Sequence, residues 1–306
     1  MKIFVTGICG QLGHDVMNEL AQRGHEGLGS DLTPIYSGVQ DGSAVCVMPY
    51  EQLDITDAKA VRESLLRVRP DAVIHCAAWT AVDAAEEKEN KNKVLAINAN
   101  GTRHIAQVCA ELECSLMYIS TDYVFDGRGE VPWQPDCEAF APLNVYGQSK
   151  LEGEQAVREL VEKFFIVRIA WVFGISGNNF IRTMLRLGHT HPTLRVVNDQ
   201  IGTPTYTLDL ARLLVDMIET EKYGAYHVTN EGGYISWYDF ACEIFRQARL
   251  PVTVQPVTTA EYGLSKAVRP FNSRLDKTKL IESGFMPLPD WRDALKRYLK
   301  EIQKIL

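Results

Sequence analysis

The run Lys2-Ile3-Phe4-Val5-Thr6, followed at once by Gly7-Ile8-Cys9-Gly10-Gln11-Leu12-Gly13, decides the fold. The first run is short, apolar and rich in β-forming residues, and Leu12, Val16 and Leu20 then recur at helical spacing. A glycine turn between strand and helix lets the backbone approach a pyrophosphate whose charge lies at the helix N-terminus. The sequence therefore predicts a dinucleotide site that includes Gly7, Gly10, Gln11, Leu12 and Gly13.

Strands and helices continue to alternate from this turn to about residue 120. We expect strands ending at 29–31, at 46–48, at 71–76 and at 116–120, a surface loop over 33–45, and a helix over 91–112. This alternation predicts an α/β fold, a Rossmann-type doubly wound parallel sheet with right-handed crossovers.

Asp31 closes the second predicted strand, where a carboxylate accepts a ribose 2′-hydroxyl and repels a 2′-phosphate. It favours NAD, although a side chain that swings away would still admit NADP. Small residues after the strand at 71–76 leave room for a ligand lying across the sheet. The remaining expected cofactor contacts are Asp54, Ile55, Ala77, Ala78, Trp79 and Asn98.

Tyr146-Gly147-Gln148-Ser149-Lys150 places a phenol and an ammonium about one helical turn apart on one face. A nearby cation favours the phenolate and lowers the pKa of a tyrosine, so the pair is a candidate general acid/base. The same spacing also occurs on solvated helix faces, so the pair by itself is weak evidence for a catalytic site. Thr121 ends the predicted strand 116–120 at the carboxyl edge of the sheet, where its hydroxyl either donates to a carbonyl oxygen or caps a turn.

The rest of the chain predicts a smaller C-terminal part. We expect a sixth strand over 165–174, in which Trp171 either walls a sugar pocket or belongs to the core, and helices over 207–220, 237–248 and 291–304 with a short strand at 225–229. Residues 1–175 are then a dinucleotide-binding Rossmann domain that carries the catalytic residues. Residues 176–306 are mostly a substrate-binding part, with some segments returning to the main domain.

Arg269 and Arg274 flank a run, 270–273, that is expected to be extended. A guanidinium offers paired donors to a phosphate, so these arginines are candidates for holding a nucleotide pyrophosphate. The alternative is an arginine pair on a solvated loop.

Composition excludes several other classes of protein. The chain has 306 residues, 46% of them hydrophobic, and a net charge of −7, which argues against a general nucleic-acid or membrane surface. Its seven cysteines include no Cys-x-x-Cys, and no His-Glu-x-x-His is present, so we expect no metal site. No segment has the length of a membrane span and the N-terminal apolar run is too short for a signal sequence, so we expect a cytoplasmic protein.

The order Gly7-x-x-Gly10-x-x-Gly13, Thr121 and Tyr146-x-x-x-Lys150 resembles the extended short-chain dehydrogenase/reductase superfamily. Within it, the runs 121–127, 142–147, 197–205 and 269–275 are similar to the dTDP-4-dehydrorhamnose reductase family, so the resemblance extends over nearly the whole chain. It implies reduction of a nucleotide-linked 4-keto-6-deoxy sugar by NADPH or NADH. Tyr146 would supply the proton, Lys150 would hold the phenol at a useful pKa and bond the nicotinamide ribose, and Thr121 would position the carbonyl. The resemblance places substrate contacts at Thr121, Asp122, Val124, Phe125, Trp171, Asn179, Arg269 and Asn272.

Two other functions share these motifs. One is a cofactor-binding regulatory protein, because the regulatory subunit of methionine adenosyltransferase resembles the same family. The other is a sugar-nucleotide epimerase, which uses the same tyrosine and lysine but keeps its NAD bound. We expect a small nucleotide-sugar substrate and neither nucleic acid nor membrane as a partner, and we allow for a homodimer.

Overall fold

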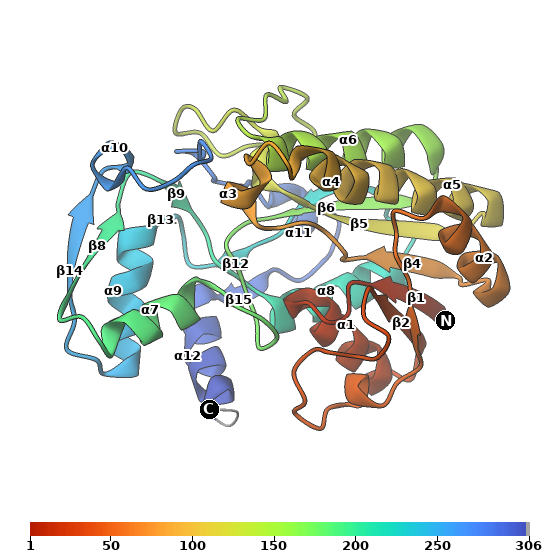
Figure 1. Cartoon of the computed structure of the whole chain (residues 1–306), viewed down its shortest axis with the longest axis horizontal. Helices are drawn as coiled ribbons and strands as arrows, with labels where there is room; N and C mark the ends of the chain where they lie inside the picture. Colours follow the sequence, from red (N-terminus) through yellow and green to blue (C-terminus); the bar gives the residue numbers. More distant parts are fainter. Residues whose placement is uncertain (304–306) are drawn as a thin grey trace.

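The computed structural model describes residues 1–303 and is built around one seven-stranded sheet (Figure 1). The strands are β1 (Lys2–Thr6), β2 (Glu26–Asp31), β3 (Tyr50–Gln52), β4 (Ala72–His75), β5 (Ser115–Thr121), β6 (Phe164–Ile169) and β11 (Gly224–His227). They all run parallel, in the order β11-β6-β5-β4-β1-β2-β3. The strand order reverses between β1 and β4, and in such sheets a crevice for ligands forms at the carboxyl ends of the strands there. The predicted doubly wound parallel sheet is confirmed.

Helices cover both faces of this sheet (Figure 1). One face carries α1 (Gln11–Gln22) and α8 (Thr207–Ile218), and the other carries α2 (Ala58–Val68), α5 (Thr102–Leu112) and α6 (Val145–Leu160). Because both faces are covered, β1 is apolar on both sides, with Ile3 and Val5 facing the α1 layer and Phe4 facing the α5 layer. Within residues 1–303, no helix is long and apolar enough to cross a membrane.

A smaller part lies beside the carboxyl edge of the sheet, on the left in Figure 1. It contains α7 (Phe180–Gly188), α9 (Trp237–Ala248), α10 (Thr259–Tyr262), α12 (Trp291–Ile302) and the parallel pair of β8 (Thr193–Val197) and β14 (Thr253–Val257), around an apolar core of its own. The connecting elements are η1 (Ala44–Cys46), α3 (Val82–Ala85), α4 (Lys91–Leu95), η2 (Ala96–Gly101), η3 (Asp122–Val124), β7 (Val172–Phe173), β9 (Ile201–Gly202), β10 (Thr205–Tyr206), β12 (Asn230–Glu231), β13 (Ile235–Ser236), α11 (Thr278–Glu282) and β15 (Leu288–Asp290). Since α8 packs on the large sheet and β11 is one of its strands, the chain crosses between the two parts more than once.

Polar caps fix where the important helices begin. Asn144 precedes α6, and its side chain accepts the backbone N–H of Gly147 at 2.8 Å. Ser236 and Asp239 form a reciprocal capping box at the start of α9. Each cap satisfies N–H groups that the first helical turn leaves free, and so defines the first residue of the helix.

Three predicted elements differ from the structure. The strand expected at 46–48 is wrong, because Val45 is drawn into the core in a 3₁₀ turn and the strand that pairs with β2 is β3. The helix expected over 91–112 is interrupted by a π-helical segment, η2, between α4 and α5. The strand expected over 165–174 breaks after β6, where Trp171 takes a left-handed φ of 51°, and resumes as β7 beside β10.

Candidate functional site

A cavity of about 1170 Å³ opens at the carboxyl edge of the sheet. The ends of β1, β4, β5 and β6 line it, together with residues from the first turns of α1 and α6 and from the smaller part. It therefore lies at the reversal of strand order, where doubly wound folds bind dinucleotides.

The glycine turn forms the floor of this cavity. A Cβ on Gly7 would lie 2.6 Å from the backbone nitrogen of Ala77, and one on Gly13 would lie 2.4 Å from the carbonyl oxygen of Gly7. Gly7 also has a φ of 74°, so only glycine fits there without strain. Gly10 offers no side chain to cap α1, which leaves the first N–H groups of the helix available to an anion in the cavity. Gln11 and Leu12 complete this wall.

Asp31 ends β2 and Asp54 follows β3, and both line the cavity beside Leu32 and Ile55, across β1 and β4 from β5. The Asp31 carboxylate accepts the N–H of Cys9 at 2.9 Å and that of Leu32 at 2.8 Å. It is therefore fixed against the glycine turn, in the place expected for a ribose-binding carboxylate.

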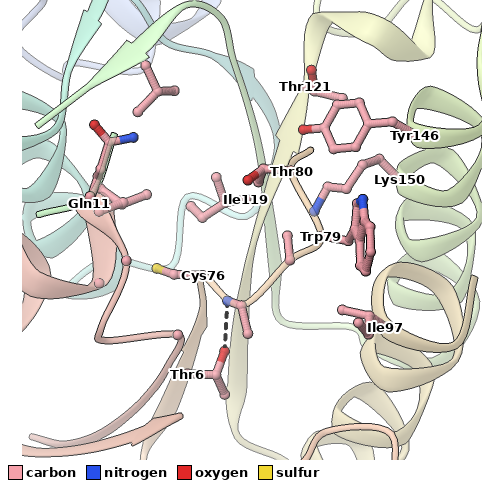
Figure 2. A pocket seen from close by; sticks show the side chains of 18 of the residues that line it. Thr6, Gln11, Cys76, Trp79, Thr80, Ile97, Ile119, Thr121, Tyr146 and Lys150 are labelled. Atoms are coloured by element: carbon pink, nitrogen blue, oxygen red, sulfur yellow. Dashed lines mark hydrogen bonds between the residues drawn. The ribbon is translucent and has the colours of Figure 1, made fainter. Parts of the chain in front are cut away.

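The segment 77–79 lines the middle of the cavity, and its backbone is held from behind. The Thr6 hydroxyl accepts the N–H of Ala77 at 3.2 Å, as Figure 2 shows. Asn98 does not line the cavity; its amide accepts the N–H of Trp79 at 2.8 Å and donates to the Trp79 carbonyl and to Ser149. Asn98 lies in the π-helical segment η2, an irregularity that is frequent at functional sites.

Thr121, Tyr146 and Lys150 point into the same space from β5 and α6 (Figure 2). We expected Lys150 to lower the pKa of Tyr146, but burial raises that pKa above its ordinary value, opposed by a hydrogen bond from Thr121. The phenol is thus held protonated, which is the form that donates a proton. Burial lowers the pKa of Lys150 to about 7, opposed by the negative charge of Glu154. The ammonium is therefore balanced between its two protonation states near neutral pH.

Two buried polar groups in the cavity wall have no hydrogen-bond partner among residues 1–303: Asp122 Oδ2 and Arg269 Nη1. The Asp122 side chain is 2% exposed, its Oδ1 accepts the Thr121 hydroxyl at 3.0 Å, and burial raises its pKa to about 6. Arg269 binds Asp83 at 2.7 Å through Nη2. Since buried polar groups are almost always satisfied, these two atoms indicate a ligand with both a hydrogen-bond donor and an acceptor.

An aromatic wall closes the end of the cavity towards the smaller part. Trp171 stacks on Trp237 with ring centroids 3.8 Å apart, and Phe180 lies 4.6 Å from Trp237. A Cβ on Gly202 would lie 2.9 Å from the Trp171 indole, so this glycine leaves room for the stack. Sequence reasoning named Trp171 but missed Trp237, Phe180 and Asn178, which also line the cavity.

Several residues named from the sequence lie behind the cavity wall instead. Val124 and Phe125 are buried in a small cluster, where Phe125 stacks on Trp133 at 4.6 Å. Asn179 caps α7 and donates to Gln11 Oε1 at 3.0 Å, which ties the glycine turn to the smaller part. Asn272 donates to two backbone carbonyl oxygens, and Arg274 donates to Asn272 rather than facing the cavity. Their side chains are engaged with protein and support the wall.

In the part of the chain that the structure describes, no group of three or more His, Cys, Asp or Glu side chains could hold a metal ion.

Comparison with known proteins relates this site to one family. The family model described as the RmlD substrate binding domain matches residues 1–304. The chain is 38% identical over 300 residues to the spore coat polysaccharide biosynthesis protein SpsK of Bacillus subtilis, covering 98% of this chain and 97% of the relative. It is 42% identical over 275 residues to the dTDP-4-dehydrorhamnose reductase of Streptomyces griseus, covering 88% of each chain. The crystal structure of dTDP-4-dehydrorhamnose reductase from Bacillus anthracis in complex with NADP superposes with a TM-score of 0.87 at 39% identity, covering 98% of this chain and all of that one.

Proposed function

Since the chain belongs to the dTDP-4-dehydrorhamnose reductase family, we propose that it reduces the C4 ketone of dTDP-4-dehydro-L-rhamnose to dTDP-L-rhamnose with NADPH or NADH. One observation carries the proposal: a glycine-lined helix N-terminus and the group Thr121, Tyr146 and Lys150 share a single cavity. The first feature suits a dinucleotide pyrophosphate and the second suits proton transfer to a carbonyl.

The residues present fit a nicotinamide dinucleotide. The absence of a side chain on Gly7 lets the turn pack against the backbone of Ala77, and the free N–H groups of α1 suit the pyrophosphate. Asp31 would accept the adenine ribose hydroxyls, and residues 77–79 would border the nicotinamide half. When bound, the reduced cofactor supplies a hydride to C4.

The side chains around Tyr146 then perform the protonation. The Thr121 hydroxyl, which donates to Asp122 Oδ1 in the structure, would turn to donate to the carbonyl oxygen and position it. The neutral phenol of Tyr146 gives its proton to that oxygen as charge develops there. The Lys150 ammonium stabilises the phenolate that remains, because a nearby opposite charge favours the ionised form.

The two unpartnered groups would recognise the nucleotide sugar. Asp122 Oδ2 can accept a sugar hydroxyl, and Arg269 Nη1 can donate to a phosphate oxygen. The stacked indoles of Trp171 and Trp237 would cover the apolar face of the 6-deoxy sugar.

The test is oxidation of NADPH or NADH on addition of dTDP-4-dehydro-L-rhamnose. Replacing Tyr146→Phe removes the proton donor and should lower kcat by about 10²–10⁴. Tyr223→Phe is a matched control outside the cavity, packed against Phe165, and should keep full activity. Folded protein that gives no turnover, or a Tyr146→Phe variant as active as the parent, would refute the assignment.

The same assay separates the alternative functions. A sugar-nucleotide epimerase would convert its substrate without releasing oxidised cofactor. A regulatory protein would bind cofactor, reduce no sugar and co-purify with a larger synthetase. A cytoplasmic location and a homodimer stay predictions, to be checked by fractionation and by light scattering.

A further inference from the structure

The Lys150 ammonium has an unusual neighbour. The side chain is 3% exposed, and within residues 1–303 its Nζ makes no hydrogen bond or ion pair. Nζ instead lies 4.0 Å from the centre of the Tyr118 ring, which is completely buried in β5. A cation over the face of an aromatic ring is attracted by the ring's negative face, and more strongly where water is excluded.

Contacts behind the ring fix it in this position. The Tyr118 hydroxyl donates to the carbonyl oxygen of Lys150 at 3.3 Å and lies 3.5 Å from that of Asn98. A Cβ on Gly153 would lie 2.3 Å from the same hydroxyl, so this glycine allows α6 to approach β5 closely enough for the contact. Tyr118 therefore holds both the main chain and the side chain of Lys150.

On α6, the charge that acts on Lys150 is the carboxylate of Glu154, which favours the ammonium form. This carboxylate is engaged elsewhere, accepting Arg168 at 2.8 and 2.7 Å and the Ser120 hydroxyl at 2.6 Å. Both members of the Glu154–Arg168 pair are buried, so the negative charge is already matched within the pair.

The groups that face Lys150 from the neighbouring strand carry no charge near neutral pH. Burial lowers the pKa of His75 to about 3 and raises that of the Cys76 thiol to about 12. Burial also raises the pKa of Tyr118 itself well above its ordinary value, so the ring stays neutral. The ring face of Tyr118 therefore stabilises an ammonium that forms no hydrogen bond or ion pair within the described part of the chain.

We propose that Tyr118 is a positioning residue whose ring face holds the Lys150 ammonium at the level of the Tyr146 phenol. The catalytic meaning of this contact rests on the proposed function, since the ammonium serves Tyr146. The contact between the ring and the ammonium does not depend on the proposed function, and it can be measured in protein that is not turning over substrate. Sequence reasoning had no signal for it, because Tyr118 occupies an ordinary buried position in the middle of a strand.

The direct test is the pKa of Lys150, measured by NMR on protein labelled with ¹³C at the lysine ε-carbon, with the resonance assigned by Lys150→Arg. Tyr118→Phe keeps the ring face and should leave this pKa within about 0.3 unit of the parent value. Tyr118→Leu removes the attraction that favours the charged form, so the pKa should fall by about one unit. Equal values in Tyr118→Leu and the parent would overturn the proposal, as would an equal fall in Tyr118→Phe.

Two further variants separate positioning from folding. Met117→Ala, one residue earlier on β5, opens a hole on the opposite face of the sheet and should leave the Lys150 pKa unchanged. If Tyr118→Leu does not fold, 3,4,5-trifluorophenylalanine at position 118 weakens the ring face with little change of shape and should also lower the pKa. An unchanged Lys150 pKa in that variant would refute the proposal.

In the reductase assay of Tyr118→Leu, the alkaline limb of the pH profile of kcat should move to lower pH by the same amount as the Lys150 pKa measured by NMR. If the Lys150 pKa falls but the protein reduces no sugar nucleotide, the proposed function alone is refuted.

Discussion

Asp31 shows how one side chain can set cofactor choice. Both of its oxygens accept backbone N–H groups, so the carboxylate is held in place at the end of β2. The cations that line the cavity are Lys93, Lys150 and Arg269, and none comes from the segments beside Asp31. A 2′-phosphate would therefore meet a fixed negative charge without a compensating cation.

We expect this chain to accept both reduced cofactors but to have a higher kcat/KM with NADH than with NADPH. Asp31→Ser removes the repulsion and should raise the NADPH-to-NADH ratio of kcat/KM by about tenfold or more, since like charges brought together cost on the order of 1–2 kcal/mol. Steady-state kinetics with each cofactor at saturating sugar nucleotide measures the ratio. Asp54→Ser, at the neighbouring strand end, is the comparison and should change the ratio much less.

At the level of residues, the sequence predicted the cavity-lining residues whose chemistry follows from their spacing along the chain. The glycines 7, 10 and 13 and the pair Tyr146 and Lys150 all line the cavity. Trp237, Phe180 and Tyr118 were missed because an aromatic residue in a helix or strand is usually core, and only the folded arrangement shows what its ring faces. The side chains of Asn179 and Asn272 lie behind the cavity wall, because their amide groups form hydrogen bonds within the protein.

One buried acid lies at the contact between α1 and α8. Asp15 of α1 is 4% exposed, and the Thr207 hydroxyl at the start of α8 donates to it. Burial raises the pKa of Asp15 from 3.8 to about 8, so the folded protein holds a proton there that the unfolded chain releases at a much lower pH. The folded state thus binds more protons than the unfolded state between these two values.

Stability should therefore fall as the pH rises through this interval. The stabilising contribution of Asp15 is fully present below its ordinary pKa and is lost between pH 4 and about 8. Over this interval the free energy of unfolding should fall by at most about 1.4 kcal/mol per pH unit. Asp15→Asn should remove this decline and give a more stable protein at pH 8 in urea unfolding. Asp41→Asn is the contrast: burial raises the pKa of Asp41, but hydrogen bonds from Ser43, together with His14 and Cys46, lower it below its ordinary value. An alkaline decline that survives Asp15→Asn would show that another group causes it.

The helices and strands were predicted best where a single face of apolar residues decides them. The parallel sheet followed from the alternation of apolar runs, and the helix expected over 237–248 is α9. The π-helical segment η2 could not be predicted, because the amide of Asn98 holds it through hydrogen bonds to the backbone of Trp79, which lies in another segment. The break at Trp171 likewise depends on packing against Gly202.

On the scale of the whole molecule, the cavity is complete only where the two parts meet. The sheet supplies the glycine turn and the Tyr146–Lys150 pair, while Trp237, Phe180 and Arg269 come from beyond residue 175. The alternating pattern predicted the first set. Of the second set, the sequence named only Arg269. The positions of Phe180 and Trp237 depend on how α7 and α9 lie against the sheet, and a sequence pattern read locally does not contain that information.

Asp83 of α3 joins the two parts at the rim of this cavity. Its Oδ1 accepts the backbone N–H groups of Lys266 and Ala267, each at 3.0 Å, and its Oδ2 accepts Arg269 at 2.7 Å. The carboxylate thus fixes a segment of the smaller part and leaves Arg269 Nη1 free for a ligand. Hydrogen bonds to a charged group are worth about 1.5–3 kcal/mol each, so this contact sets the position of Arg269.

Asp83→Ala should therefore weaken binding of the nucleotide sugar more than it affects the chemical step. We expect the KM for the sugar nucleotide to rise about tenfold or more, with a smaller change in kcat and little change in the KM for NADH, because Asp31 and the glycine turn lie at the ends of β2 and β1, across β4 from β5. Glu87→Ala is the matched control: it removes an exposed ion pair of 2.8 Å with Lys266, and such pairs contribute about 0–1 kcal/mol. If the two variants raise the KM equally, the segment 266–269 is not held through Asp83, and Arg269 must find its position from the smaller part alone.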